Sequence, residues 1–180
     1  MSTYCLEQAE QLHADLAALK AIEVKDAASV CAYIKGYWEF IINHKMFGSI
    51  WDIYADEIEV RRENGFSLVG IQAVENNYMN LCAAFPDLHM DVAAIFAAPV
   101  GEDAWLVWMR YYFTGTNNSV SIYGQPTGQK LEHDKALNIS SFTVRKIDGE
   151  WLITNEYTGH CCDYIRAICT GDESFTALQL

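Results

Sequence analysis

Ionisable side chains gather just after the first proline of the chain, at Pro86. His89 and Asp91 stand two residues apart in a segment that begins a strand-like pattern, and residues two apart in a strand share a face. An aspartate can orient a nearby histidine and raise its basicity, which suits acid–base catalysis near neutral pH. We therefore predict His89 and Asp91 as catalytic residues. The alternative is that they form only a solvated strand end.

A second polar group lies in residues 130–146, which alternate like a strand. The even-numbered set includes Asp134, Asn138 and Phe142, and the odd-numbered set offers a face for dimerisation instead. We favour the even set facing a pocket, which makes Asp134 the third catalytic candidate, because burial beside apolar walls would raise its pKa. A solvated charge next to a turn is the alternative.

The last predicted strand, residues 151–158, carries one more carboxylate. Strict alternation places Trp151 and Asn155 on one face and Glu156 on the other. Trp151 is large enough to pack the strand against helices, so we expect Asn155 to point inward and Glu156 outward. Hydrogen bonds from Asn138 or Asn155, or from Tyr54 or Tyr78, would then stabilise an enolate oxygen.

The elements that position these residues follow from hydrophobic periodicity. Steps of three and four predict helices over residues 3–21, 27–45, 50–56, 70–85 and 162–170. A period of two predicts strands over residues 57–63, 88–97, 104–115, 130–146 and 151–158. Helices come first and a four-strand antiparallel meander last, which is an α+β arrangement. We expect one domain over 1–180, with a core of about 26–160, an N-terminal helix 3–21 and a C-terminal tail 160–180.

A sheet of this length, curled around helices, forms a cone with a mouth. The chain has five tryptophans and ten tyrosines to line it, and ligand pockets are mostly apolar with a few directed polar groups. We predict a small hydrophobic ligand or substrate inside; the alternative is that the aromatic residues only fill the core. The candidate binding residues are Tyr54, Tyr78, Trp108, Tyr112, Asn138, Phe142 and Asn155.

Composition excludes several classes of partner. The net charge of −12 disfavours nucleic acid, and no apolar stretch is long enough for a membrane span.

The first residues lack the basic segment and the apolar segment of a secretory signal peptide, so we expect a cytoplasmic protein. Six cysteines then indicate reduced thiols. The segment HCCD at residues 160–163 has poor spacing for zinc, so we expect no metal site.

An ordered series of motifs carries a family resemblance: WDIYADEIEV, FPDLHMDVAAIFA, RYYFTGT, GQPTGQKL and FTVRKIDGEW. Together they resemble the SnoaL-like polyketide cyclase family, within the nuclear-transport-factor-2-like (NTF2-like) superfamily, over about residues 30–158. The resemblance implies an NTF2-like cone with helices over the concave face of a curved sheet. It also implies a hydrophobic cavity, a homodimer through the convex face and no organic cofactor or metal. Asp87 in the FPDL motif would serve the turn by accepting backbone N–H groups.

The sequence departs from the family at its catalytic strand. SnoaL-type cyclases use an aspartate on a late strand, where this chain has Asn138, Ser140, Ser141 and Thr143, and Ile153 stands where many relatives carry glutamate. We therefore predict a cofactor-independent lyase, isomerase or cyclase that moves a proton of a small hydrophobic carbonyl compound with a His/Asp pair. The alternative is a non-catalytic ligand-binding or dimerisation module of the same fold.

Overall fold

The computed structural model describes residues 3–172. Its helices are α1 (Thr3–Lys20), α2 (Ala27–Asn43), α3 (Ile50–Ile53), α4 (Ile71–Ala84) and α5 (Cys162–Thr170). Short 3-10 turns occur at η1 (Phe47–Ser49), η2 (Glu63–Gly65) and η3 (His133–Lys135). All five expected helices are present, with α3 shorter than expected. The end of the predicted tail, residues 173–180, lies outside the described residues.

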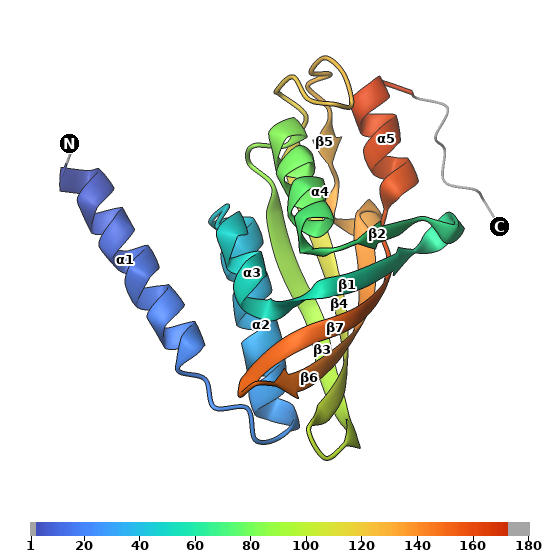
Figure 1. Ribbon diagram of the computed structural model, residues 1–180. Coiled ribbons are helices and arrows are strands. Elements are labelled where there is room, and N and C mark those ends of the chain that lie inside the picture. The colour runs from blue at the N-terminus through green and yellow to red at the C-terminus, as the bar shows by residue number, and fades with distance from the viewer. Residues whose placement is uncertain (1–2, 173–180) are drawn as a thin grey trace.

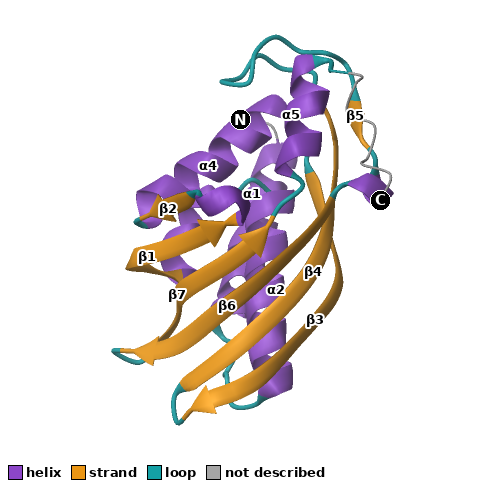
Figure 2. Cartoon of the chain, turned by 90° about the vertical axis from the view of Figure 1, so that its right-hand side faces the viewer, coloured by secondary structure: helices purple, strands orange, loops and turns teal. Residues whose placement is uncertain are grey.

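The strands form one curled sheet. They are β1 (Tyr54–Arg62), β2 (Ser67–Val69), β3 (His89–Gly101), β4 (Ala104–Thr116), β5 (Lys130–Leu131), β6 (Leu137–Ile147) and β7 (Glu150–Gly159). Their order is β2-β1-β7-β6-β4-β3, with β5 on the end of β4. The expected meander is confirmed, since β3, β4, β6 and β7 pair antiparallel in turn. β1 joins β7 in parallel, and Figure 2 shows the helices behind the curled sheet.

Helix α2 occupies the concave side of the sheet. It starts at a capping box, in which Asp26 accepts from the Ser29 N–H at 2.7 Å and the Ser29 hydroxyl accepts from the Asp26 N–H at 2.9 Å. The helix then presents an apolar stripe to the sheet. The buried residues of this stripe are Val30, Tyr33, Ile34, Tyr37, Trp38, Phe40, Ile41 and Ile42. The chain is therefore an α+β cone with a helix inside it.

Helix α1 extends away from this body (Figure 1). It touches α2 where Leu19 lies over Gly36, and a Cβ at Gly36 would come within 2.5 Å of Leu19 Cδ2. Gly36 thus permits the close approach of the two helices. Within residues 3–172, no helix has the combined length and apolar character to cross a membrane.

The entry into the sheet after α4 has the geometry implied by the family resemblance. Asp87 Oδ1 accepts a hydrogen bond from the Thr116 N–H at 2.7 Å. This contact ties the start of β3 to the end of β4, because His89 pairs with Thr114 in the same ladder. The turn role expected for Asp87 is confirmed.

A single β-bulge decides which side chains of β7 enter the cone. Ile153 pairs with Val144, but Asn155 pairs with Thr143, so Thr154 is an extra residue with no opposite partner. An extra residue shifts the alternation of all later side chains to the other face. Strict alternation gave the wrong orientation here: Ile153 and Glu156 are both buried, and Asn155 is half-exposed.

The predicted strand 130–146 is interrupted. β5 ends at Leu131, and a 3-10 turn precedes β6. The turn closes where the Ala136 N–H donates to the carbonyl oxygens of Glu132 and His133, at 3.1 and 3.2 Å. Asp134 therefore belongs to a turn and not to the strand face that we assigned it. The expectation for the rest of the even set is correct, since Asn138 and Phe142 are buried.

The long connection between β4 and β5 is held by one buried amide. Asn117 is 2% exposed. Its Nδ2 donates to the Ala84 carbonyl at 3.1 Å, and its Oδ1 accepts from the Thr127 N–H at 2.9 Å. The Thr127 hydroxyl donates to the Ile168 carbonyl at 2.8 Å. Asn117 therefore fastens the connection to the end of α4 and, through Thr127, to α5.

Candidate functional site

The buried polar side chains of the sheet converge inside the cone on one carboxylate. Glu156 is 1% exposed. Its Oε2 accepts a hydrogen bond from the Tyr54 hydroxyl at 2.5 Å, and its Oε1 accepts from the Ser140 hydroxyl at 3.3 Å. Ser140 also lies 2.5 Å from the Thr158 hydroxyl. Tyr54 of β1 and Ser140 of β6 thus donate hydrogen bonds to the buried acid of β7, and Thr158 of β7 contacts Ser140.

The hydrogen bonds continue from this acid toward the mouth of the cone. The Ser140 hydroxyl lies 3.3 Å from the Tyr111 hydroxyl, which in turn lies 3.2 Å from His160 Nε2. A continuous chain therefore runs from Glu156 through Ser140 and Tyr111 to His160. Hydroxyl groups both donate and accept, so such a chain can pass a proton along its length.

Burial changes the proton affinities at both ends of this chain. Desolvation raises the pKa of Glu156 to about 7, against the opposing effects of the Tyr54 hydrogen bond and the Arg62 charge. Desolvation and then Arg62 hold the pKa of His160 well below its ordinary value. Near neutral pH, His160 is therefore uncharged and Glu156 is divided between its two protonation states.

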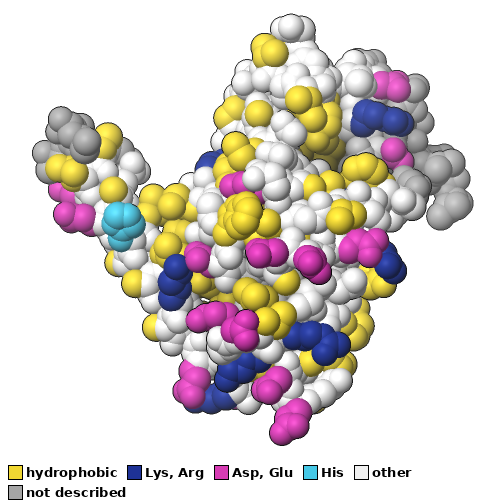
Figure 3. Space-filling view, viewed as in Figure 1, with side chains coloured by type: hydrophobic (Ala, Val, Ile, Leu, Met, Phe, Trp, Pro, Cys, Tyr) yellow, Lys and Arg dark blue, Asp and Glu magenta, His cyan; other side chains and the backbone are white. Residues whose placement is uncertain are grey.

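A pocket of about 250 Å³ opens at the end of the chain where His160 lies. Arg62, His160 and Cys162 form part of its wall, and the apolar side chains of Leu81 and Ile165 form another part. Figure 3 shows apolar side chains around the hollow between α4 and α5. His160 is common to the pocket and to the hydrogen-bonded chain, so it connects the outside of the cone to Glu156.

Aromatic side chains fill the centre of the cone. Trp38 of α2 contacts the rings of Tyr54, Tyr78 and Phe142, at centroid distances of 6.1, 4.9 and 6.2 Å. Three of the predicted binding residues therefore lie inside the cone, where each packs against Trp38. None of these four rings lines the pocket between α4 and α5.

The predicted catalytic residues lie elsewhere. His89, Asp91 and Asp134 are exposed, and the Asp134 side chain is 98% accessible. His133 joins two of them, with Nε2 3.2 Å from Asp91 and Nδ1 3.1 Å from Asp134. These hydrogen bonds, first to Asp134 and then to Asp91, raise the pKa of His133. The structure thus brings Asp91 and Asp134 together on the outer surface and not in the cone.

The remaining predicted binding residues divide between the two faces of the sheet. Asn138 is buried, and its Oδ1 accepts from the Cys161 N–H at 3.1 Å. Trp108 and Tyr112 lie on the outer face, since the odd-numbered residues of β4, such as Tyr111, point inward. Asn155 also turns away from the interior, because of the bulge at Thr154.

Besides Glu156, which strict alternation placed outside the cone, sequence reasoning missed Tyr111, His160 and Arg62. Tyr111 continues an inward series in β4 with Val107, Met109 and Phe113, and this alternation could have found it. His160 stands one residue beyond β7, where alternation no longer specifies a face. Arg62 is the last residue of β1, and no sequence motif marked it as a site residue.

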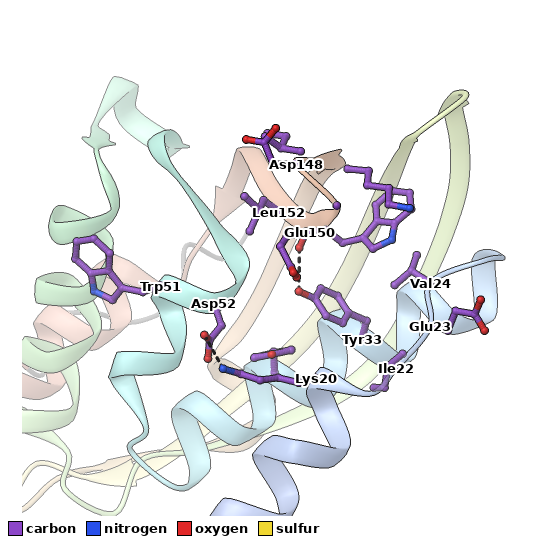
Figure 4. A pocket seen from close by; sticks show the side chains of 15 residues that line it. Lys20, Ile22, Glu23, Val24, Tyr33, Trp51, Asp52, Asp148, Glu150 and Leu152 are labelled. Carbon is purple, nitrogen blue, oxygen red and sulfur yellow. Dashed lines mark hydrogen bonds and ion pairs between the residues drawn. The ribbon is translucent and has the colours of Figure 1, made fainter.

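A larger hollow of about 810 Å³ lies between the connection of α1 to α2 and the β6–β7 hairpin. Figure 4 shows the Lys20–Asp52 ion pair, 3.0 Å long, and the Tyr33 hydroxyl, which donates to the Trp151 carbonyl at 2.9 Å. The groove is open and its charged groups lie near its rim, so they are solvated. It does not reach the buried acid, and we place the candidate site at the smaller pocket.

Metal-binding residues do not converge in the described part of the chain. Over residues 3–172, no group of three or more His, Cys, Asp or Glu side chains is arranged to hold an ion. The six cysteines are all free thiols. Burial raises the pKa of Cys161 to about 12 and of Cys162 to about 11, so neither is a reactive thiolate near neutral pH.

The cone and its inner helix have the NTF2-like fold, which similar solved structures share. One is an NTF2-like superfamily protein from Salmonella enterica, with a TM-score of 0.58, 16% identity and coverage of 74% of this chain and 89% of that chain. A putative SnoaL-like polyketide cyclase from Jannaschia has a TM-score of 0.55, 13% identity and coverage of 74% and 89%. A putative scytalone dehydratase from Novosphingobium aromaticivorans has a TM-score of 0.54, 14% identity and coverage of 71% and 78%. At these identities the likeness shows the fold.

The sequence itself places the chain more narrowly. The family model of the SnoaL-like polyketide cyclases matches residues 32–159, and the chain belongs to this family. A comparison with curated proteins gave no match. The matched range includes β7 and ends one residue before His160, so the family match covers Glu156 but not the histidine.

Proposed function

We propose that the protein is a cofactor-independent acid–base enzyme that moves a proton of a small hydrophobic carbonyl compound, in a lyase, isomerase or cyclase reaction. The observation that carries this proposal is the hydrogen-bonded chain from Glu156 to His160 at the pocket. A carboxyl group with a pKa of about 7 can both accept and release a proton near neutral pH.

The proposed step is the removal of a proton from the carbon next to a carbonyl group. The C–H bond breaks and its electron pair becomes the enolate. His160 accepts the proton at the pocket, and Tyr111 and Ser140 transfer a proton to ionised Glu156. The same chain then returns a proton to the product. Because the pKa of His160 is lowered and that of Glu156 is raised, the proton does not stay on His160 and is bound more strongly by Glu156.

Deuterium exchange tests this proposal without knowledge of the natural substrate. In D2O, the wild type should incorporate deuterium next to the carbonyl of small cyclic or aryl ketones, as followed by proton NMR. Glu156→Gln and His160→Gln should each slow exchange by about 10²- to 10⁴-fold. The wild-type rate should rise with pH through about 7, because only ionised Glu156 accepts a proton.

The matched control is Asp134→Asn, since Asp134 is the carboxylate first predicted from the sequence and its side chain is exposed. This variant should exchange at the wild-type rate. Loss of exchange in Asp134→Asn, with full activity in Glu156→Gln, would support the sequence-based assignment instead. Ligand binding without exchange in the wild type would identify a non-catalytic binding module.

We also propose that the protein is a homodimer through the outer face of the sheet. Phe96 is 60% exposed and stacks on Trp108 at 5.3 Å. Trp108 pairs with Ser141, and Ser141 with Tyr157, so a row of three aromatic rings and one serine crosses the face. Apolar surfaces of this kind mark interaction sites, and a second copy presents a self-complementary face.

Light scattering after size-exclusion chromatography tests the dimer. The wild type should have twice the mass of one chain, and Phe96→Glu should have the mass of one chain, because a charge would be buried at the interface. Ile122→Glu is the control, since Ile122 is exposed in the β4–β5 connection. A wild type that is monomeric at micromolar concentration would contradict the proposal.

A further inference from the structure

The guanidinium of Arg62 has a free edge inside the protein. Its Nη1 lies 3.9 Å from the Cys162 sulfur, which is a weak contact. Its Nε and Nη2 are buried and have no hydrogen-bond partner. These two nitrogens form one side of the planar guanidinium, the side that matches two oxygens of a carboxylate. Buried donors without acceptors are rare in folded proteins, so this edge needs an explanation.

Arg62 is charged despite its burial. Desolvation opposes the charged form, but Tyr78, Cys162 and Glu156 outweigh it and raise the pKa of the guanidinium. Glu156 accepts hydrogen bonds from Tyr54 and Ser140 and makes none to Arg62 in the described structure. The positive charge is therefore only partly compensated within the protein, and an added anion would complete it.

The same side chain forms part of the pocket that contains His160. Leu81, Tyr123 and Ile165 give this pocket an apolar wall. Arg166, the other arginine of the wall, lies 3.7 Å from Asp163, and both side chains are largely exposed. A ligand in this pocket lies against apolar surface and beside the Arg62 side chain, in a protein whose net charge is −12.

We propose that the pocket binds a small apolar carboxylate, with its two oxygens paired to Nε and Nη2 of Arg62. The inference rests on the proposed function in one respect: it makes the substrate a carbonyl compound that also carries a carboxylate. Arg62 would then hold the ligand beside His160, with its apolar part against α4 and α5. The volume of about 250 Å³ fits a ligand smaller than the drug-sized ones that occupy roughly 300–1,000 Å³.

Three matched probes test the chemistry of this pocket: phenylacetate, phenylacetamide and phenylphosphonate. Isothermal titration calorimetry should show that the wild type binds phenylacetate at least about 10-fold more tightly than phenylacetamide, because only the carboxylate forms charge-assisted hydrogen bonds in pairs. Phenylphosphonate should bind more weakly than phenylacetate, because its head group is more strongly hydrated and its third oxygen would be buried without a partner. A phosphonate preference, or equal binding of the amide, would overturn the inference.

Two substitutions at Arg62 and one control locate the contact. Arg62→Met should lose the preference for phenylacetate and keep or raise the melting temperature of the free protein, because it removes a buried charge without a full partner. Arg62→Lys keeps the charge but loses the planar pair of N–H donors, and it should weaken phenylacetate binding at least about 5-fold. If Arg62→Met fails to fold, the affinity of Arg62→Lys tests the inference instead. Arg145→Gln is the control, because Arg145 is exposed on β6 and does not line this pocket, and it should bind phenylacetate like the wild type. Undiminished binding in both Arg62 variants would overturn the inference.

The outcomes separate this inference from the proposed function. Phenylacetate binding through Arg62, without deuterium exchange on any ketone or keto acid, would support the carboxylate site and contradict the proposed enzymatic function. Exchange on neutral ketones that depends on Glu156, without a carboxylate preference, would support the enzymatic function and contradict the role of Arg62.

Discussion

Glu156→Gln is expected to stabilise the protein at pH 8 and to flatten its pH dependence. Folding raises the pKa of Glu156 from 4.5 to about 7, so its favourable contribution is complete below pH 4.5 and is lost as the pH rises through 7. The total loss is about 3 kcal/mol. A glutamine does not titrate and can still accept from Tyr54, so the variant should keep this stability at alkaline pH.

Urea unfolding at pH 5, 6, 7 and 8 measures the effect. The free energy of unfolding of Glu156→Gln, minus that of the wild type, should increase with pH across this series. His160 contributes the opposite trend, because its pKa is lowered, but it is present in both proteins and largely cancels in the difference. Glu57→Gln, at an exposed position of β1, is the control and should run parallel to the wild type. A parallel curve for Glu156→Gln would show that the acid is not buried as described.

Asn117→Ala should be the second strongly perturbing change. It leaves the Ala84 carbonyl and the Thr127 N–H without their buried partners. Each unsatisfied group costs about 1–3 kcal/mol, so the free energy of unfolding should fall by about 2–6 kcal/mol. The connection from β4 to β5 and helix α5 should lose hydrogen-exchange protection first, since Asn117 and Thr127 join them.

The neighbouring Asn118→Ala provides the comparison, because Asn118 is exposed on the same connection. It should change stability by less than about 0.5 kcal/mol. Equal urea midpoints for the two variants would mean that the buried amide is not what holds this region.

The fold could be predicted because periodicity is a property of many residues together. The change from a period of three to four to a period of two falls where α4 ends and β3 begins, and errors at single positions do not hide it. The capping box of α2 is a local device, because Asp26 and Ser29 lie three residues apart. The turn role of Asp87 was implied by the FPDL motif, although its partner Thr116 belongs to the end of β4.

The site could not be predicted to the same degree, because single insertions in the strand pattern decide it. The bulge at Thr154 puts Glu156 inside the cone, whereas strict alternation puts it outside. The turn at residues 133–135 likewise removes Asp134 from the strand face. A bulge depends on pairing with a neighbouring strand, and that pairing is not visible in the strand's own sequence.

The extra residue at Thr154 keeps both halves of β7 in contact with the core. Ahead of it, Ile153 packs in the core, and beyond it Glu156 and Thr158 belong to the polar interior while Tyr157 lies outside. Removal of Thr154 would leave a regular ladder, in which Ile153 still pairs with Val144, Asn155 with Thr143 and Glu156 with Phe142. A chain that is one residue shorter at this point can therefore hold the same acid inside the cone.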